Sequence, residues 1–413
     1  MELIKYMDFS ANLLFTAAVT VILIVLGYFL IISVFGWRKR PENHEVSYPD
    51  KNYAIIVAAH NEQAVIGNTI RSIKAMNYPK EKYEVFVIAD NCTDDTANTA
   101  RDCGAVVFER QDALNKGKGH ALKWMFEKLF GAEFKFDAVC ILDADNLVSK
   151  DFLLQIDKKM QKGYQVVQGY RDMKNPWDSW ITSSYSITYW LANRLCQLPR
   201  QYLGMNCTLT GSGYAVSIET LKTIGWEIET LTEDVEFYFQ LCLNDVKIGW
   251  AHDAVIFDEQ PVTLSQSWRQ RTRWMQGHFS CTFLYGRQAF NKLLKDKSLQ
   301  AFDTVVMLFY PFLYVMGSVL MAFQAMKTVA SQIDDANLKA LLLFAVMSVI
   351  TFVIQNIFSV TVLVNENKAS KNLIMGLVVL PIFNFTWVPI MIQGYFSRKN
   401  KDWAHIAHTS TAA

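Results

Sequence analysis

Apolar and polar positions divide the chain into membrane-like and soluble parts. Near the start, residues 12–35 form an uncharged apolar run, which is followed by Trp37-Arg38-Lys39-Arg40. Such a run is long enough to cross a bilayer core of about 30 Å, and aromatic and basic residues are typical of the cytoplasmic boundary of a membrane helix. A cleaved signal peptide would have a shorter apolar run and a small-residue cleavage site. The pattern therefore predicts a transmembrane helix within residues 1–40, followed by a cytosolic domain.

Three further apolar stretches lie late in the chain and predict a transmembrane bundle over residues 301–397. They cover about residues 303–329, 338–364 and 372–396. Buried core helices rarely contain apolar runs of this length, so membrane spans are the better explanation.

The last of these stretches raises a question of topology. If all three crossed the bilayer, the tail Arg398-Lys399-Asn400-Lys401 would lie outside the cell, whereas basic residues tend to remain inside. Pro381 and Pro389 interrupt the stretch at 372–396, so a re-entrant segment or a hairpin is an alternative to a third crossing. The sequence leaves both alternatives open.

Between the apolar parts, residues 50–260 have ordinary polar content and alternate strands with helices. The predicted strands cover residues 53–59, 84–90, 105–110 and 138–145, and the predicted helices cover 64–76, 94–103 and 119–129. Strands that alternate with helices favour a parallel sheet covered on both faces. Ligands of such sheets bind beyond the carboxyl ends of the strands. Acidic residues occupy those positions here: Glu62, Asp90, Asp143 and Asp145.

Two other segments are predicted to form helices at a membrane surface. Residues 176–200 contain three tryptophans, and residues 261–300 contain Gln270-Arg271-Thr272-Arg273-Trp274. Aromatic and basic side chains on one helix are typical of the boundary between lipid and water.

Composition narrows the class of protein further. The chain has 413 residues, of which 51% are hydrophobic and 19% charged, and its formal net charge is +1. So apolar a chain is not disordered, and a nucleic-acid-binding protein would show a clear basic excess. The seven cysteines are scattered without a CxxC pair, which favours reduced thiols over a disulfide framework or a zinc site.

Two motifs near the strand ends suit phosphate chemistry. The carboxylates of Asp143-Ala144-Asp145 can bind Mg²⁺ or Mn²⁺, which prefer carboxylate and phosphate oxygens, although a helix cap is the alternative explanation. Asn115-Lys116-Gly117-Lys118-Gly119-His120 is a glycine-lysine turn before a helix, where amides and lysines suit a phosphate. A solvated turn is the alternative for this second motif.

Two motifs on helices suit transfer chemistry. Thr232-Glu233-Asp234 precedes an amphipathic helix and either caps it or supplies Asp234 as a general base. In Gln270-Arg271-Thr272-Arg273-Trp274, the two arginines offer planar donors for a diphosphate, and Trp274 offers a face for a sugar ring. A basic membrane-surface helix is the alternative for that motif.

Taken in order, the motifs resemble those of family 2 glycosyltransferases with the GT-A fold. The resemblance rests on residues 53–62, Asp90, Asp143-Ala144-Asp145, Thr232-Glu233-Asp234 and Gln270–Trp274 and covers about residues 50–280. The membrane layout is similar to that of the hyaluronan, cellulose, chitin and poly-N-acetylglucosamine synthases. The resemblance implies an α/β GT-A domain with a mostly parallel sheet, joined to transmembrane and interfacial helices.

The resemblance also implies a role for individual residues. The UDP part of a UDP-sugar donor would contact Ala58, Glu62, Asp90, Lys118, Asp143, Gln270, Arg271 and Arg273. Asp145 would bind Mg²⁺ or Mn²⁺, and Asp234, with Glu233 beside it, would be the catalytic base. The acceptor would contact Trp274, Gly211 and Ser212, and the tail at 398–413 would gate the site through Trp403 and His408.

The implied function is processive, inverting synthesis and export of a β-linked polysaccharide from UDP-glucose or UDP-N-acetylglucosamine. The enzyme would lie in the plasma membrane as a multi-pass protein with a cytosolic catalytic domain, with the growing glycan as acceptor and a second copy or another subunit as partner. The alternative is transfer of one sugar to a lipid-linked or short oligosaccharide acceptor. A non-catalytic membrane scaffold and a transporter are weaker alternatives, because the motif residues are intact and the middle domain is soluble in character.

Overall fold

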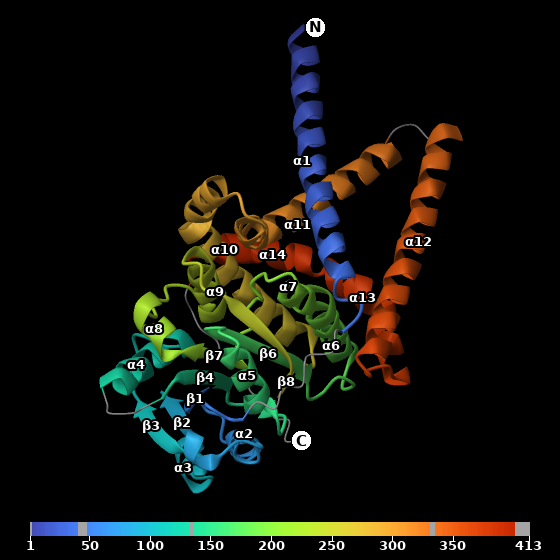
Figure 1. The fold of residues 1–413 in the computed structure, drawn as a ribbon. Helices are drawn as coiled ribbons and strands as arrows, with labels where there is room; N and C mark the ends of the chain where they lie inside the picture. The colour runs from blue at the N-terminus through green and yellow to red at the C-terminus, as the bar shows by residue number, and fades with distance from the viewer. Residues whose placement is uncertain (1, 40–47, 132–135, 331–334, 401–413) are drawn as a thin grey trace.

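The computed structural model describes residues 2–39, 48–131, 136–330 and 335–400. Figure 1 shows an α/β domain from which long helices rise on one side. The domain is built on an eight-stranded sheet with the strand order β3-β2-β1-β4-β7-β6-β8-β5. The strands are β1 (Tyr53–Ala59), β2 (Tyr83–Asp90), β3 (Val106–Arg110), β4 (Ala138–Asp143), β5 (Leu147–Val148), β6 (Val166–Met173), β7 (Tyr214–Ser217) and β8 (Ile248–Asp258).

The sheet is mixed but mostly parallel. Among the described strands, β1, β2, β3, β4, β6 and β8 share one direction, whereas β7 and β5 run antiparallel to their neighbours. The predicted α/β fold is therefore confirmed, and the first four strands lie within two residues of their predicted bounds. Because β7 runs in the reverse direction, the residues just before it lie at the edge where the parallel strands end.

Helices cover both faces of the sheet, as the alternation of strands and helices predicts. One face packs against α2 (Ile66–Lys74), α3 (Thr96–Asp102) and α5 (Phe152–Gln161), and the other against α4 (Lys118–Gly131), α6 (Trp180–Ala192) and α9 (Glu233–Leu243). Successive side chains of β1 alternate between the two cores: Ile55 and Val57 face the first, and Ala54 and Ile56 the second. Both faces are buried, which explains the continuous apolar runs of the central strands.

The segment at 176–200 forms helices, but its principal helix is buried. It folds into α6, a π-helical turn η2 (Asn193–Gln197) and α7 (Leu198–Tyr202). Trp190 is only 1% exposed, and most of α6 is buried between the sheet and a later helix, α13 (Ile374–Phe385). The structure thus contradicts a membrane-surface position for α6, because its serines allow α13 to cover it.

The motif Gln270–Trp274 lies on one long helix, α10 (Leu264–Asp296). A capping box begins this helix: the Thr263 hydroxyl accepts from the amide of Gln266, and the Gln266 side chain accepts from the amide of Thr263. The predicted interfacial region at 261–300 is therefore mostly one continuous helix that runs beside the domain.

The long helices outside the domain are α1 (Glu2–Val34), α11 (Leu299–Ala330) and α12 (Asp335–Asn365), and they splay apart as they leave it (Figure 1). Three described segments are long and apolar enough to cross a membrane: Phe15–Val34, Leu299–Phe323 and Lys371–Ser397. A shorter apolar helix covers Val349–Asn365 in α12. The chain is thus a membrane protein, while the domain boundaries and the orientation in the membrane stay predictions.

The stretch at 372–396 forms neither a hairpin nor one straight helix. After a short 3-10 turn, η3 (Lys371–Leu373), it continues as α13 and α14 (Trp387–Ser397), which meet at Thr386. Figure 1 shows both helices lying across the domain, at the base of the three splayed helices.

Two buried ionic clusters attach the splayed helices to the domain. Arg200 donates to Asp303 of α11 at 2.8 Å, and Tyr28 of α1 donates to the same carboxylate at 2.6 Å. Arg194 and Tyr170 donate to Glu366, just after α12, at 2.9 and 3.0 Å. Breaking a buried ion pair by removing one partner typically costs about 3–5 kcal/mol, so these clusters hold the helix bases in place.

Candidate active site

A cavity of about 410 Å³ opens at the carboxyl edge of the sheet. Residues from the strand ends, from the turn before β7 and from α4, α9 and α10 line it. The predicted site residues that face it are Ala58, Glu62, Asp90, Lys118, Asp143, Asp145, Gly211, Glu233, Asp234, Gln270, Arg273 and Trp274. Arg271 and Ser212 do not line it, and Trp403 and His408 lie outside the described residues.

Asp90 at the end of β2 is held by an arginine that the sequence analysis missed. The Arg110 guanidinium donates to the Asp90 carboxylate at 2.6 Å, and both side chains are buried. The two residues are register partners in β2 and β3, so only the strand pairing shows that they meet. A ring nitrogen of His60 also lies 2.7 Å from the Asp90 carbonyl oxygen, which fixes the adjoining turn.

The turn that contains Asp143 and Asp145 is held by buried polar contacts. The amide of Asp143 donates to the Ser212 hydroxyl at 2.9 Å, and that hydroxyl in turn donates to Asn146. Ser212 is fully buried in this contact, so the structure contradicts its predicted role at the acceptor. Its position before the reversed strand β7 makes it a support for the acidic turn.

Lys118 joins the strand ends to α9. Its ammonium group donates to Asp143 and, at 2.6 Å, to the carbonyl oxygen of Gly211, and it lies 3.5 Å from the Glu233 carboxylate. Burial lowers the pKa of Lys118, but Asp143 and Glu233 outweigh that effect and raise it. The lysine is therefore charged, and it places a positive charge in the cavity between the strand ends and α9.

The acidic turn has the donor chemistry of a magnesium or manganese site. Asp143, Asp145 and Glu259 all line the cavity, and Asp145 is only 3% exposed. Within the described ranges, no group of three or more acidic, histidine or cysteine side chains is arranged to hold a metal alone. The residues thus fit an ion that takes one or two carboxylates from the protein and its other ligands from a bound phosphate and water, as Mg²⁺ commonly does.

Asp234 is a carboxylate with altered acidity at the start of α9. Burial and the neighbouring Glu233 raise its pKa to about 7, and Lys118 partly opposes them. The Thr232 hydroxyl makes no capping bond, so the simple capping explanation of this motif does not hold. Gly211 has a φ of 86°, and a methyl group added there would lie 3.5 Å from the Asp234 carboxylate. Because its pKa is close to physiological pH, Asp234 can act as a base there.

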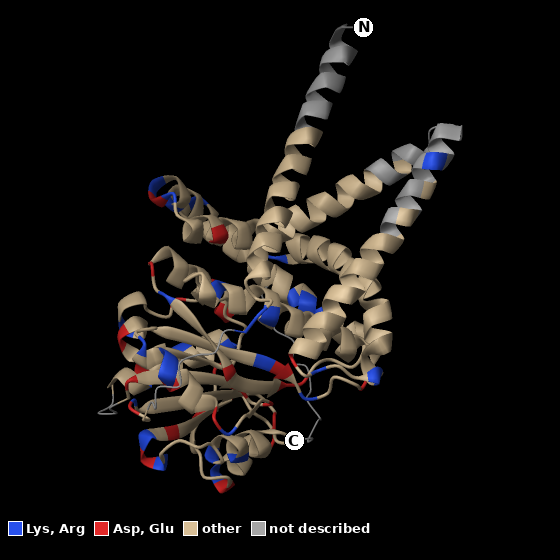
Figure 2. Ribbon diagram, turned by 45° about the vertical axis from the view of Figure 1, so that its right-hand side comes forward, with Lys and Arg blue, Asp and Glu red and all other residues tan. Residues whose placement is uncertain are grey.

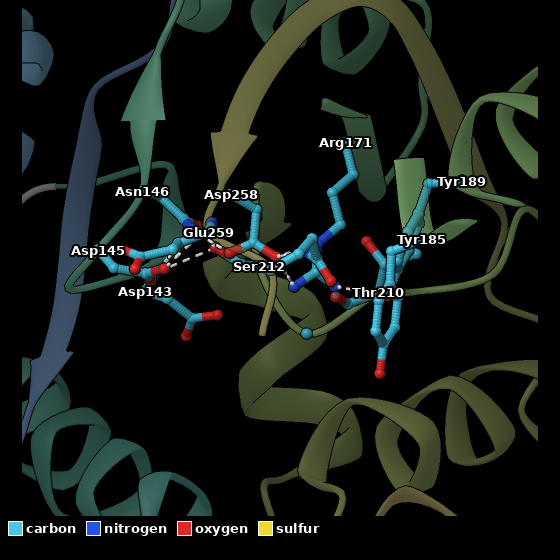
Figure 3. A network of polar contacts seen from close by, with 12 residues as sticks. Asp143, Asp145, Asn146, Arg171, Tyr185, Tyr189, Thr210, Ser212, Asp258 and Glu259 are labelled. Carbon is cyan, nitrogen blue, oxygen red and sulfur yellow. Dashed lines mark hydrogen bonds and ion pairs between the residues drawn. The ribbon is translucent and has the colours of Figure 1, made fainter. Parts of the chain in front are cut away.

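Arg171, Asp258 and Glu259 also line the cavity, and the sequence motifs did not predict them. Arg171 of β6 donates to Asp258, at the end of β8, and at 2.6 Å to the carbonyl oxygen of Thr210 (Figure 3). Figure 3 also shows Asn146, which donates to Asp258 at 3.0 Å. Asp258 and Glu259 follow an apolar strand as the other site acids do, so that pattern could have revealed them, whereas Arg171 leaves no such signal.

The helix α10 supplies the opposite wall. Gln270, Arg273, Trp274 and His278 line the cavity at the spacing of one helix face. The buried ring of Tyr185 stands edge-on to Trp274, with centroids 6.3 Å apart, and its hydroxyl donates to the Gln270 side chain at 3.4 Å. The contacts of Tyr185 therefore hold the Gln270 and Trp274 side chains in position at the cavity wall.

His278 links this wall to α11. Its Nε2 lies 3.1 Å from the Met307 carbonyl oxygen and 3.2 Å from that of Leu308. Pro311, four residues after Met307, has no N–H to satisfy that carbonyl within the helix, so the histidine takes this role. Burial lowers the pKa of His278 to about 4, which keeps the ring neutral. The sequence motifs did not predict His278 as a site residue, although it lies one turn after Trp274.

Arg271 points away from the cavity. Its guanidinium is fully buried, donates to the Thr386 hydroxyl at 2.9 Å and lies over the rings of Phe383 and Trp387 at 4.4 and 4.9 Å. The structure therefore contradicts the prediction that Arg271 contacts the donor diphosphate, because α13 and α14 surround its side chain.

A mostly parallel sheet whose acidic strand ends face the half-buried carboxylate of Asp234 is the architecture of a glycosyltransferase with the GT-A fold. A sequence profile of the family described as "Glycosyltransferase like family 2" matches residues 49–277. The chain belongs to glycosyltransferase family 2 and is an enzyme of that family.

Three named relatives show the range of that family. The chain is 24% identical to the probable glycosyltransferase YdaM of Bacillus subtilis over 75% of this chain and 76% of that protein. It is 30% identical to the beta-monoglucosyldiacylglycerol synthase of Nostoc sp. over 62% of this chain and 54% of that protein. It is 23% identical to the poly-beta-1,6-N-acetyl-D-glucosamine synthase of Staphylococcus epidermidis over 60% of this chain and 62% of that protein. The alignments thus span less than two thirds of the two synthases.

A solved structure agrees with the fold over nearly the whole chain. The mannosyltransferase PcManGT from Pyrobaculum calidifontis, in complex with GDP-Man and Mn²⁺, is similar with a TM-score of 0.62 over 94% of this chain and 99% of that one. The sequence identity is 16%, so this likeness concerns the fold alone. The predicted family and fold are confirmed.

Proposed function

We propose that the enzyme transfers sugars with inversion from a UDP-sugar, UDP-glucose or UDP-N-acetylglucosamine, and polymerises them into an exported β-linked glycan. The position of Asp234 carries this proposal. A base with a pKa of about 7 lines the same cavity as Lys118 and Asp145 at the strand ends and Trp274 on α10. A donor diphosphate at the strand ends and an acceptor sugar on Trp274 would both reach Asp234.

The transfer step follows from this placement. Asp234 accepts the proton of the acceptor hydroxyl while the hydroxyl oxygen forms a bond to the anomeric carbon. The bond from that carbon to the diphosphate breaks, and UDP leaves with the electron pair. Attack from the opposite face converts an α-linked donor into a β-linked product. Lys118 and Arg273 line the cavity as cationic side chains that can orient the diphosphate.

Asp145, with Asp143 beside it, would hold Mg²⁺ or Mn²⁺, whose positive charge offsets the charge that builds on the leaving diphosphate. Ala58, Glu62, Asp90 and Gln270 would contact the remainder of the donor, since they line the same cavity.

Trp274 favours a glycan acceptor, because it lines the cavity and its flat aromatic face suits a sugar ring. Export needs a polar path through hydrocarbon, and the described helices do not enclose one. Only 11% and 17% of the most apolar windows of Phe15–Val34 and Leu299–Phe323 are buried within the protein. A processive synthase would therefore need helices from a second copy or another subunit around these two.

The same exposed helices favour a second candidate, the transfer of one sugar to a lipid acceptor. Because most of the apolar windows of Phe15–Val34 and Leu299–Phe323 is exposed, lipid can contact these helices down to the domain; Figure 2 shows few charged residues on the described parts of the long helices. The relative from Nostoc sp., with its 30% identity, is named for a glucosylated lipid. Product size separates this candidate from the first.

The test is to offer each UDP-sugar with Mn²⁺ to the purified, lipid-reconstituted chain and to measure UDP release together with product size. A long polymer supports the first candidate, and a lipid that carries one sugar supports the second. Asp234→Asn is the inactive control, and Asp245→Asn is its matched active control, because Asp245 is an exposed residue just after α9. No UDP release by the wild-type chain with any UDP-sugar and acceptor lipid would contradict the proposal.

A further inference from the structure

The segment Lys371–Ser397 is apolar enough to cross a membrane, yet the structure attaches it to the catalytic domain along its whole length. Both of its main helices, α13 and α14, lie across the base of α1, α11 and α12 instead of rising beside them (Figure 1). This placement applies to either acceptor, because it depends on contacts outside the cavity.

Hydrogen bonds join α14 to α10 over about three turns. Trp268 donates to Gln393 at 2.7 Å, Gln276 donates to the Ser397 hydroxyl at 2.9 Å, and Ser280 donates to the Arg398 carbonyl oxygen at 3.3 Å. The two helices nearly touch between these bonds: a methyl group at Gly394 would lie 2.6 Å from Met275 Cβ. Only glycine allows this approach, so α14 follows the helix that carries Gln270 and Trp274.

The helix α13 is fixed in the same way against α6. A methyl group at Gly376 would lie 2.6 Å from Ser183 Cβ, and Leu380 and Phe383 are buried in the main core. Where α13 meets α14, the buried Arg271 holds the corner through Thr386 and two aromatic rings. Its Nε and Nη2 have no hydrogen-bond partner, so the aromatic faces provide most of its stabilisation.

The outer side of the segment has the character of a membrane surface. A stripe of large apolar side chains is exposed along it: Ile374, Met375, Val378, Ile382, Phe385 and Phe396. The second half of α10 continues this character with exposed Phe283, Phe290 and Leu294, and the basic Arg287 and Lys295 are exposed among them. Apolar stripes mixed with basic residues are typical of helices that lie in the plane of a bilayer surface.

We propose that residues 371–397 lie in the plane of the bilayer surface that faces the catalytic domain, and that α1, α11 and α12 are the segments that cross. If α14 crossed instead, it would carry α10 with it, and the charged cavity lined by Asp234 and Arg273 would enter hydrocarbon at great cost. The helix α12 has 31 residues, about 46 Å at 1.5 Å per residue, and residues 341–364 carry no charge.

Two consequences follow. The chain after Ser397 remains on the side of the catalytic domain, where Arg398 and Lys399 satisfy the tendency of basic residues to stay inside. The helix α10 lies between the cavity and the bilayer, so the cavity wall at Trp274 and His278 is about one helix diameter, roughly 10–12 Å, from lipid. An acceptor can therefore pass between the membrane and the base without crossing open water.

Membrane depth tests the proposal directly. A nitroxide amino acid is placed by stop-codon suppression at residue 378 or 396 of the full chain in liposomes, which leaves the native cysteines untouched. Val378 and Phe396 are both exposed and are separated by 18 residues, about 27 Å of helix. We expect equal, shallow depths at both positions, with Val319 of α11 as the deep control. A depth difference approaching about 27 Å would show a crossing and overturn the proposal.

The side of the C-terminus provides an independent readout. A fluorescent protein fused after Ala413 should fluoresce in the cytoplasm, and alkaline phosphatase fused there should be inactive. The matched control is a fusion truncated after Ala330, at the far end of α11, which should give the opposite result. Active phosphatase after Ala413 would contradict the in-plane placement even if the enzyme transfers sugars normally.

Discussion

The two halves of the cavity differ in how they treat charge. At the strand ends, charged groups are paired with one another, as Arg110 with Asp90, Lys118 with Asp143, and Arg171 with Asp258. On α9 and α10, Asp234 has a raised pKa and His278 is neutral. The strand-end half suits a diphosphate and a cation. The half on α9 and α10 contains a carboxylate whose pKa is about 7. Under the proposed function, most donor contacts lie at the strand ends, α9 supplies the base, and Lys118 contacts both regions.

The largest effect should come from removing the base. Asp234→Asn keeps the size of the side chain but cannot accept the proton, so kcat should fall by about 10²–10⁴. Affinity for UDP should be retained, because the strand-end half is intact. UDP release and titration calorimetry measure the two quantities. Turnover at the wild-type rate in this variant would remove Asp234 from the mechanism.

The corresponding change in the strand-end half is Asp145→Asn. Loss of one carboxylate from a metal site should lower transfer by about a hundredfold at fixed Mn²⁺, since metal charge stabilisation is worth several kcal/mol. The metal concentration for half-maximal rate should rise, and excess Mn²⁺ should restore part of the activity. An unchanged metal dependence would place the ion elsewhere.

The pH profile tests the cause of the raised pKa. Because Asp234 acts as a base only when it is ionised, kcat/KM should rise about tenfold between pH 6 and pH 8 for a pKa of about 7. Lys118→Met removes the cation that opposes burial, so the same limb should move to higher pH. A profile that is flat from pH 6 to 8 would be inconsistent with this assignment.

A smaller effect is expected at the acceptor. Trp274→Ala removes an aromatic face worth about 0.5–1.5 kcal/mol, so the acceptor KM should rise about two- to tenfold. Hydrolysis of the donor by water should change little, because Trp274 would not contact the diphosphate. Equal losses in transfer and in donor hydrolysis would argue for a donor-binding role instead.

The smallest effect concerns stability. Asp234 has a folded pKa of about 7 against an unfolded value of 3.8, so the folded protein retains a proton that unfolding releases. Its stability therefore falls as pH rises through that window. Asp234→Asn removes the free-energy cost of ionising this side chain in the folded protein. Its Tm should therefore rise more at pH 8 than at pH 5, by about 2–4 °C for each kcal/mol of that cost. Calorimetry that finds an equal Tm shift at both pH values would contradict it.

Residues that follow strands could be predicted, whereas residues that meet across strands could not. Asp90, Asp143 and Asp145 each follow an apolar run, and parallel strands bring such positions to one edge. Arg110 and Arg171 reach the same place only through strand register and a bulged pairing between β6 and β8. The prediction that Arg271 contacts the donor was wrong for a similar reason, because α13 and α14, more than 100 residues later in the chain, surround its side chain.

The sequence by itself determined the acidic strand ends and the four apolar stretches, because short-range patterns of apolar and polar residues specify these features. The class of the enzyme followed from the resemblance of its motifs to those of family 2 glycosyltransferases. Tertiary structure decided which apolar stretch lies against the domain and which side chains face the cavity. Composition alone treats the stretches at 303–329 and 372–396 alike. Close packing at Gly376 and Gly394 distinguishes them, because it holds α13 against α6 and α14 against α10 of the domain.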